Sequence, residues 1–411
     1  MQMTTADSHT ALSFLELENR YSAHNYHPLP VVLSRGQGVH VWDVDGKKYY
    51  DFLSGYSALN QGHCHPKIIS TLIHQAQKLT LTSRAFHSDQ FAEYAQFITS
   101  YFGYDKVLPM NTGVEAVETA IKLARRWGYD VKGIPENKAR IIVFEDNFHG
   151  RTSTVISFSS DPSSYTGFGP YMPGFDLIPY NDLAALTKAL QQKDVAAILM
   201  EPIQGEAGVV VPDDGYLSKA YASCKEANVL FIGDEIQTGL GRTGKMLACD
   251  HENVRPDILI LGKALSGGVL PVSAVLADDE IMLTIKPGEH GSTYGGNPLA
   301  CAVAVTALKV LKEEQMTENA AVMGEYFRRG LQKIASPFIQ TIRGKGLLNA
   351  VVIHQTRPDA AWDLCLELKE NGLLAKPTHG NKIRFAPPLT ITQSQLDECL
   401  EIIEESLASL K

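Results

Sequence analysis

Between about residue 65 and residue 300, short apolar runs alternate with segments of helical periodicity, and this alternation restricts the possible folds most strongly. The runs are short and rich in isoleucine, leucine and valine, at residues 141–144, 196–200, 229–232 and 258–261. Runs of this kind, separated by helices, are typical of parallel strands that are buried on both faces. We therefore predict an α/β fold with a large domain in which helices sandwich a mostly parallel sheet.

Two helices of this region carry clear start signals. The sequence Thr112-Gly-Val-Glu115 matches a capping box, and apolar side chains follow at helical spacing until Gly128, where we expect the helix to stop. Asn297 and Pro298 supply an N-cap and a proline at the first helical position. An alanine-rich helix is predicted from there to about residue 314.

The two ends of the chain differ from this central pattern. Alternating residues on both sides of Asp45-Gly46 predict a β-hairpin near the N-terminus. Residues from about 315 onward predict helix, strand, helix, a turn at 378–381, a strand at 383–386 and a closing helix from Thr392. We expect a small α+β domain built from both chain ends. The predicted limits are 1–60 for the N-terminal segment, 61–296 for the large domain and 297–411 for the linking helix and C-terminal part.

Charge and apolar patterning argue against several classes of protein. The chain has 37 Lys and Arg against 46 Asp and Glu in 411 residues, a net charge of −9, which is unlike the basic surface of a nucleic-acid binder. The longest apolar runs are far below the ~18 residues that a membrane span needs. The first basic residue is Arg20, after three acidic ones, unlike a secretory or transit peptide. We expect a cytoplasmic protein that binds neither nucleic acid nor membrane; a processed organellar form fits equally.

Three local patterns suggest chemistry that their context does not support. The six cysteines form no C-x-x-C pair, and the neighbours His63, Cys64 and His65 point in different directions, so no metal site is expected. Residues 239–245 match the glycine spacing of nucleotide-binding loops. Six residues, 233–238, separate this loop from the preceding apolar run, and Met246 replaces the Ser or Thr of a phosphate-binding loop. We predict a structural loop, with a nucleotide-binding protein as the alternative from another class.

Asp234 and Lys263 both lie just past predicted strands. They are 29 residues apart, which is the length of one strand–helix–strand step, so in a parallel sheet both side chains emerge at the same edge. An amine and a carboxylate in one crevice suit pyridoxal phosphate, which needs a Schiff-base lysine and an acid beside its ring nitrogen. The capped helix start at 112–114 offers backbone amides for the phosphate. The sequence therefore predicts a pyridoxal-phosphate site at this edge.

Motifs along nearly the whole chain then identify a family. They are Tyr21-Ser-Ala-His-Asn-Tyr26, Asn60-Gln-Gly-His-Cys-His-Pro, Asn111-Thr-Gly-Val-Glu, Asn147-Phe-His-Gly-Arg151-Thr, Glu201-Pro-Ile-Gln-Gly-Glu206, Asp234-Glu-Ile-Gln-Thr-Gly, Gly262-Lys263-Ala-Leu-Ser, Gly291-Ser-Thr293-Tyr-Gly-Gly-Asn and Lys376-Pro-Thr-His-Gly. With these residues the sequence resembles the class III, fold type I aminotransferases, and among them the ornithine aminotransferase subfamily.

The resemblance implies a role for each motif at the cofactor. Lys263 would form the Schiff base and move the proton, Asp234 would pair with the pyridine nitrogen, and Gln237 would reach the phenolic oxygen. The remaining implied contacts are Phe148 and Ile236 on the two ring faces, the Gly113 and Val114 amides on the phosphate, and Ser292 and Thr293 on the partner subunit's phosphate. The last contact implies an obligate homodimer with active sites at the subunit interface.

The resemblance also implies the substrates, L-ornithine and 2-oxoglutarate. Arg151 would bind the ornithine carboxylate and Tyr26 its α-amino group, with Tyr56 bordering the pocket. Arg384 would seat a 2-oxoglutarate carboxylate, and Glu206 would mask Arg384 while ornithine is bound. The δ-amino group would pass to 2-oxoglutarate by a ping-pong reaction, giving L-glutamate and glutamate 5-semialdehyde, which cyclises to pyrroline-5-carboxylate. Without the motifs, Glu206 and Arg384 could equally be an ion pair on the surface, and Tyr26 and Tyr56 could equally be packed in the core.

Alternatives stay open within and outside this family. Another class III ω-aminotransferase, acting on acetylornithine or 4-aminobutyrate, has the same cofactor motifs. Tyr26 would distinguish an enzyme for ornithine from these, because the free α-amino group of ornithine needs a polar partner there. A non-catalytic homologue is a further alternative. Two residues depart from the family pattern: His149 stands where tryptophan is common, and Val117 where glycine is common. We expect neither to touch the proposed chemistry, with His149 at most altering the pocket rim.

Overall fold

A seven-stranded sheet forms the centre of the large domain in the computed structural model, which describes residues 10–354 and 358–410. Its order is β4-β10-β9-β8-β7-β5-β6. The strands are β4 (Lys106–Met110), β5 (Arg140–Phe144), β6 (Phe175–Ile178), β7 (Val195–Met200), β8 (Leu230–Asp234), β9 (Ile258–Leu261) and β10 (Ser273–Ala277). Strands β6, β5, β7, β8 and β9 run parallel, and β10 is antiparallel to β9 and β4. The predicted mostly parallel sheet is confirmed.

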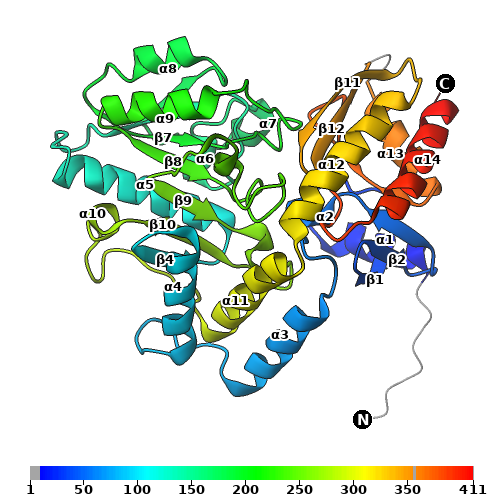
Figure 1. Cartoon of the computed structure of the whole chain (residues 1–411), viewed down its shortest axis with the longest axis horizontal. Coiled ribbons are helices and arrows are strands. Elements are labelled where there is room, and N and C mark those ends of the chain that lie inside the picture. The colour runs from blue at the N-terminus through cyan, green and yellow to red at the C-terminus, as the bar shows by residue number, and fades with distance from the viewer. Residues whose placement is uncertain (1–9, 355–357, 411) are drawn as a thin grey trace.

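Helices cover both faces of this sheet (Figure 1). Every residue of β7 is buried, as expected for a strand with helices on both sides. The helix α5 (Gly113–Asp130) packs against one face, where its Ala120 and Leu123 share an apolar core with Ile141 and Val143 of β5. The helices α8 (Leu183–Ala189) and α9 (Tyr216–Glu226) cover the other face.

The helix α5 begins as predicted and ends two residues later than predicted. Thr112 Oγ1 accepts from the Glu115 amide, and the Glu115 carboxylate accepts from the Thr112 amide, which completes the capping box. Gly128 does not stop the helix, so that expectation was wrong. A Cβ at Gly128 would lie 3.0 Å from the Ala196 Cβ, so the glycine permits close packing of the helix on β7.

The small domain combines residues from both chain ends in two sheets. One sheet has the order β1-β2-β3-β13, with β1 (Leu33–Gln37), β2 (His40–Asp43), β3 (Lys48–Asp51) and β13 (Leu373–Leu374). The other has the order β11-β12-β15-β14, with β11 (Ile339–Lys345), β12 (Leu348–Ile353), β15 (Lys382–Phe385) and β14 (Lys376–Thr378). Because β13 pairs in parallel with β3, C-terminal residues complete the N-terminal sheet. The predicted domain limits stay a prediction.

The helix α11 (Pro298–Glu313) leads from the large domain to α12 (Met316–Lys333), as Figure 1 shows. Asn297 caps it by accepting from the Ala300 amide, as predicted. The other helices of the described chain are α1 (Ala11–Tyr21), α2 (Ser54–Ser57), α3 (Pro66–Lys78), α4 (Asp89–Phe102), α6 (Ser153–Ile156), α7 (Pro162–Tyr165), α10 (Asp279–Met282), α13 (Ala360–Glu370) and α14 (Gln393–Ser409). None of the helices in the described ranges is long and apolar enough to span a membrane.

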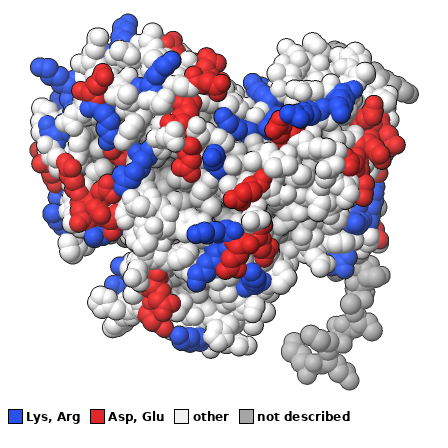
Figure 2. All heavy atoms as spheres, viewed as in Figure 1, with Lys and Arg blue, Asp and Glu red and all other residues white. Residues whose placement is uncertain are grey.

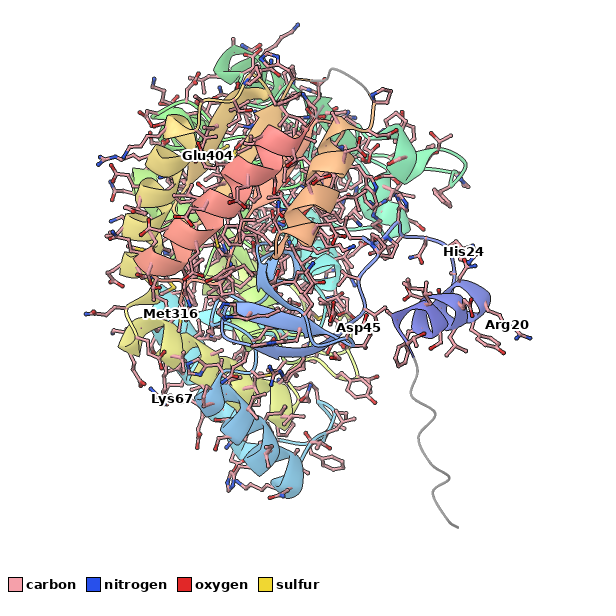
Figure 3. All side chains as sticks on the ribbon, turned by 90° about the vertical axis from the view of Figure 1, so that its right-hand side faces the viewer. Arg20, His24, Asp45, Lys67, Met316 and Glu404 are labelled. Carbon is pink, nitrogen blue, oxygen red and sulfur yellow. The ribbon has the colours of Figure 1, made fainter. Side chains whose placement is uncertain are left out.

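The surface has an isolated helix and a mixed distribution of charge. The helix α1 has no buried residue and stands away from the body of the protein (Figure 3). Acidic and basic side chains are intermixed over the face drawn in Figure 2, where no single acidic region dominates.

Candidate active site

The carboxyl ends of β8 and β9 bring Asp234 and Lys263 to one edge of the large sheet. Asp234 is the last residue of β8 and lies opposite Ile260 of β9, and Lys263 follows β9 by two residues. Both side chains line a cavity of about 260 Å³. The other residues around it are Gly113, Val114, Phe148, His149, Gly150, Glu201, Glu206, Ile236 and Gln237. The crevice predicted from strand spacing is therefore present.

The Lys263 amine lies in surroundings that make it easier to deprotonate. Burial lowers the pKa of the amine, and this effect outweighs the charge of Glu206, which raises it. Lys263 also has a φ of 44°, in the left-handed region that ordinary side chains avoid. A less protonated amine is what nucleophilic work requires.

Asp234 is held by His149, a histidine for which the sequence predicts no role. His149 Nδ1 and Asp234 Oδ2 are 2.6 Å apart, and both side chains are buried. Burial lowers the pKa of His149, but the hydrogen bond and charge of Asp234 outweigh it, so the pKa is raised overall. The expectation that His149 stays away from the proposed chemistry was wrong, because its ring lines the cavity and is buried against Asp234, not exposed at the rim. Val117, the other departure, lies in the apolar core.

Glu201 is a second buried acid that lines the cavity. Its carboxylate accepts from the Phe148 amide at 2.9 Å and from the Gly205 amide at 3.3 Å, so it holds the loop that carries the Phe148 ring. Burial raises the pKa of Glu201 to about 7, against the nearby His149. Its motif was visible in the sequence, but this contact joins residues 53 positions apart and no local signal announces it.

The helix start beside this cavity leaves room for a ligand group. The first amides of α5 have no carbonyl to bond within the helix. A Cβ at Gly113 would lie 3.0 Å from Ile236 Cδ1, and a Cβ at Gly150 would lie 2.4 Å from Val114 Cγ2. Gly150 also has a φ of 127°. Two glycines thus keep a cradle open at the positive end of a helix, where a phosphate binds well.

These residues fit pyridoxal phosphate. The cavity offers a buried amine, a carboxylate fixed by its neighbours, an aromatic ring and a helix N-terminus open to a phosphate. His149 Nε2 is buried without a hydrogen-bond partner in the described chain, so the ring is committed to Asp234 through Nδ1 alone. The individual cofactor contacts of the predicted residues stay predictions.

A cluster of three polar side chains borders the cavity on the small-domain side. Arg384, on β15, donates from Nη1 to Glu206 Oε1 at 2.7 Å and to Gln237 Oε1 at 3.3 Å, and Gln237 Nε2 donates to Glu206 Oε1 at 3.0 Å. Arg384 is 2% exposed and Glu206 17%. Burial raises the pKa of Glu206, but Arg384 and Lys263 outweigh it and lower the pKa to about 2. This is a largely buried ion pair, not the exposed surface pair considered as an alternative.

The other predicted substrate residues lie nearby. A second cavity of about 210 Å³ is lined by Arg151 and shares Phe148 and Glu206 with the first. The Arg384 guanidinium lies 5.2 Å from the centre of the Tyr56 ring. Burial, Glu206 and Tyr26 raise the pKa of Tyr56. Tyr26 is 72% exposed and Tyr56 is half-buried, so neither tyrosine belongs to the apolar core.

Ser292 and Thr293 do not line the cavity of their own chain. Ser292 Oγ accepts from Asn111 Nδ2 at 2.7 Å, next to the start of α5. Their predicted contact with a partner subunit's phosphate stays a prediction.

The remaining sequence patterns have structural explanations. The glycine loop at 239–245 is not followed by an α-helix, and its Arg242 is fully buried, so it lacks the helix start that both nucleotide motifs require. His63 contacts Asp51 at 2.7 Å while His65 contacts Glu314 at 3.2 Å. Within residues 10–354 and 358–410, no three His, Cys, Asp or Glu side chains gather as metal ligands would.

Comparison with known proteins defines the class. The family profile of the class III aminotransferases matches residues 21–407. The mitochondrial ornithine aminotransferase of Rattus norvegicus is 62% identical over 96% of this chain and 90% of its own length. Among solved structures, the ornithine aminotransferase of Toxoplasma gondii has a TM-score of 0.96 at 50% identity, covering 98% of this chain and 96% of the other. The acetylornithine aminotransferase of Elizabethkingia anophelis has a TM-score of 0.89 at 58% identity, covering 97% and 99%.

The chain belongs to the class III aminotransferases. It is a pyridoxal-phosphate-dependent aminotransferase of fold type I, in agreement with the cavity and its lysine. Within the class, proteins named ornithine aminotransferase from animals, fungi and apicomplexan parasites are 54–62% identical to it over nearly its full length.

Proposed function

We propose that this enzyme transfers the δ-amino group of L-ornithine to 2-oxoglutarate, giving glutamate 5-semialdehyde and L-glutamate. The observation that carries the proposal is the pair of Arg384 and Glu206 beside the cavity, with Arg151 in the adjoining cavity. An enzyme that takes a diamino acid with one carboxylate and then a dicarboxylate needs two carboxylate-binding arginines, of which one is blocked while the diamino acid is bound. A glutamate paired with one of them meets this need.

The residues of this chain have separate tasks in such a reaction. Bound pyridoxal phosphate would supply a carbonyl that takes up the amino group and a ring that withdraws electrons from the substrate carbon. Lys263 would move a proton at the carbon that carries the amine, and Asp234, supported by His149, would keep the ring nitrogen protonated. Arg151 would hold the ornithine carboxylate away from the cofactor by a bidentate contact.

Glu206 would act as the selector between the two half-reactions. Glu206 pairs with Arg384 in the structure, and with ornithine bound this pair would stay intact, so no second carboxylate could be seated close to the cofactor. When 2-oxoglutarate enters, its carboxylate would displace Glu206 from Arg384. Gln237 contacts both side chains, and its amide would again donate a hydrogen bond to the Glu206 carboxylate when 2-oxoglutarate leaves.

The second candidate is transfer from acetylornithine, which the similarity to the Elizabethkingia anophelis structure favours. The two substrates differ at the α-amino group, which is charged in ornithine and acylated in acetylornithine. Tyr26 would be the partner of the free amine. Its position near the Tyr56 phenol supports a place for it at the pocket entrance.

Single-turnover spectra would separate the candidates. The holoenzyme is mixed with ornithine, acetylornithine or 4-aminobutyrate, and the visible band of the bound cofactor is followed as the amine is transferred. Ornithine should react fastest, and Tyr26→Ile should slow ornithine more than 4-aminobutyrate. A faster reaction with acetylornithine would refute the ornithine assignment, and an equal loss for all amines would refute the role of Tyr26. A purified protein that stays colourless after reconstitution would contradict cofactor binding.

The homodimer is part of the same proposal. Ser292 and Thr293 lie outside the cavity of their own chain, and Phe86 and Tyr294 expose 74% and 59% of their surface. These features support a surface that a second copy covers. A monomeric mass in sedimentation, with full activity, would contradict it. Cytoplasmic localisation stays a prediction, because the relatives from Rattus norvegicus and Drosophila melanogaster are named mitochondrial.

A further inference from the structure

Arg242, in the glycine loop at 239–245, is a fully buried arginine with neutral hydrogen-bond partners. It is 0% exposed, and no carboxylate in the described ranges forms an ion pair with it. Buried cations are usually paired with an acid, because leaving a charge among neutral groups is costly. Burial lowers the pKa of Arg242 to about 9, so its guanidinium is still charged at neutral pH. Burying this charge costs free energy, so we ask what the guanidinium contributes in return.

The guanidinium joins three separate parts of the chain. Its Nε and Nη2 donate to Asn60 Oδ1 at 3.1 and 2.6 Å. Its Nη1 donates to the carbonyls of Leu347 and Pro387 at 3.0 and 2.5 Å. Arg242 belongs to the loop after β8, Asn60 precedes α3, and the two carbonyls belong to the small domain. One planar group therefore links all of them.

Backbone contacts reinforce the same junction. The Leu347 amide donates to the Arg242 carbonyl at 3.0 Å, so these two residues are bonded in both directions. Asn60 Nδ2 donates to the Leu240 carbonyl at 2.9 Å, and the Asn60 carbonyl accepts from the Leu389 amide at 2.8 Å. The junction is thus specified by side chains and backbone together.

The two small-domain acceptors flank the strands that carry Arg384. Leu347 directly precedes β12, and Pro387 follows the end of β15 by two residues. Arg384 on β15 lies opposite Ala350 on β12. We propose that Arg242 is a positioning residue, which holds this strand pair, and hence Arg384, in place against the cofactor cavity. The inference rests on the proposed role of Arg384 in binding 2-oxoglutarate.

Arginine suits this task better than other residues. Its rigid fork carries five donors, which can reach acceptors on several segments at once, whereas a lysine offers one compact head group. The charge of Asp51 raises the pKa of Arg242, and the charge of Arg384, a neighbouring cation that repels it, lowers that pKa. A rigid, multiply bonded guanidinium can keep Arg384 at a set distance in spite of that repulsion.

The test compares the two half-reactions of the holoenzyme, because only the second one uses Arg384. Arg242→Lys should raise the KM for 2-oxoglutarate about tenfold or more and leave the rate of the ornithine half-reaction within about twofold. Lys132→Met serves as a stability control, since the Lys132 amine bonds the Val195 and Ala227 carbonyls of the large domain, away from this junction. The control should lower the melting temperature without changing the ratio of the two half-reactions.

A second pair of variants covers the case in which Arg242→Lys does not fold. Asn60→Asp keeps the Oδ1 acceptor, and Asn60→Ala removes it, while both lose the bond from Nδ2 to Leu240. Asn60→Ala should raise the KM for 2-oxoglutarate, whereas Asn60→Asp should have a KM close to that of the unmodified enzyme. Equal changes in both half-reactions, or the same shift in Lys132→Met, would overturn the proposal.

The parent proposal is checked in the same series. If the unmodified enzyme does not convert ornithine with 2-oxoglutarate, or if Arg384→Lys leaves the KM for 2-oxoglutarate unchanged, the proposed function fails. If Arg384→Lys raises that KM and Arg242→Lys does not, only the positioning role of Arg242 fails.

Discussion

Replacing Glu206 with glutamine removes the negative charge that pairs with Arg384 while keeping the size of the side chain. In the protein the two groups are 2.7 Å apart, and Arg384 is almost completely buried. We expect the freed arginine to bind carboxylates more tightly. The KM for 2-oxoglutarate should fall, and ornithine should begin to react through its α-amino group, because its own carboxylate can now reach Arg384.

The size of the effect follows from the pKa of Glu206. Its burial raises the pKa, and Arg384 with Lys263 lowers it to about 2, against an ordinary 4.5. At about 1.4 kcal/mol per pKa unit, the surroundings favour the carboxylate by about 3 kcal/mol. Arg384 is the first favourable contribution to this shift and Lys263 the second. A hydrogen bond to a charged group is worth about 1.5–3 kcal/mol, and 2-oxoglutarate would have to break the one between Glu206 and Arg384, so Glu206→Gln should lower the KM for 2-oxoglutarate by about tenfold or more.

The assay measures the KM for 2-oxoglutarate and the product of single turnover with ornithine, in which the α-transfer product is separated from the semialdehyde. Glu313→Gln is the matched control, because it removes one charge from an exposed pair with Lys67 that is worth about 0–1 kcal/mol. The control should leave both quantities unchanged. An unchanged KM and an unchanged product ratio in Glu206→Gln would refute the masking argument.

The same pair predicts a pH dependence of stability. The folded pKa of Glu206 lies below the ordinary value, so its stabilising contribution is complete above about pH 4.5 and is lost as the pH falls toward about 2. Between pH 5 and pH 2, the free energy of unfolding should therefore decrease more in the unmodified protein than in Glu206→Gln. If the unfolding free energies of the two proteins fall by the same amount over this pH range, the lowered pKa of Glu206 is contradicted.

Three further predictions concern the cofactor cavity. Lys263→Ala should abolish transamination and the borohydride trapping of cofactor on the chain; trapping that persists would place the amine elsewhere. His149→Phe removes a charge-assisted hydrogen bond to Asp234 worth about 1.5–3 kcal/mol, so the cofactor Kd should rise about tenfold or more in a titration, whereas His149→Asn should keep most of the affinity. Gly150→Ala would place a Cβ 2.4 Å from Val114 Cγ2, and equilibrium dialysis should detect weaker cofactor binding; unchanged binding would show that the cradle tolerates the methyl group.

Local patterns were sufficient for β5, β7, β8 and β9 and for the two residues at the ends of β8 and β9, whereas β4, β6 and β10 were not predicted. The buried runs, the capping box of α5 and the positions of Asp234 and Lys263 depend on neighbours along the chain, and the periodicity of a strand or helix reveals them directly. Parallel strands end at one edge, so two residues just past adjacent strands had to meet. The pairing of Arg384 with Glu206 came from family resemblance, because no spacing rule connects two residues 178 positions apart.

Other features were decided only by tertiary packing. Gly128 looks like a helix stop, yet contact with Ala196 makes it a packing residue. His149 looks like a rim residue, but the arrangement of the loop after β5 places its ring against Asp234. Arg242 sits in a loop that resembles a nucleotide motif, and only the approach of the small domain gives its guanidinium acceptors.

The physical reason is the range of the interactions. Strand burial and helix capping are set by residues within a few positions, so the sequence by itself predicted the sheet edge with Asp234 and Lys263 and the cofactor that suits them, and its motifs, by resemblance, predicted the class of enzyme. Hydrogen bonds among buried side chains depend on which distant segments come within about 3 Å of each other, and only the folded chain determines that. The partners of His149, Glu201 and Arg242 therefore became known only from the structure.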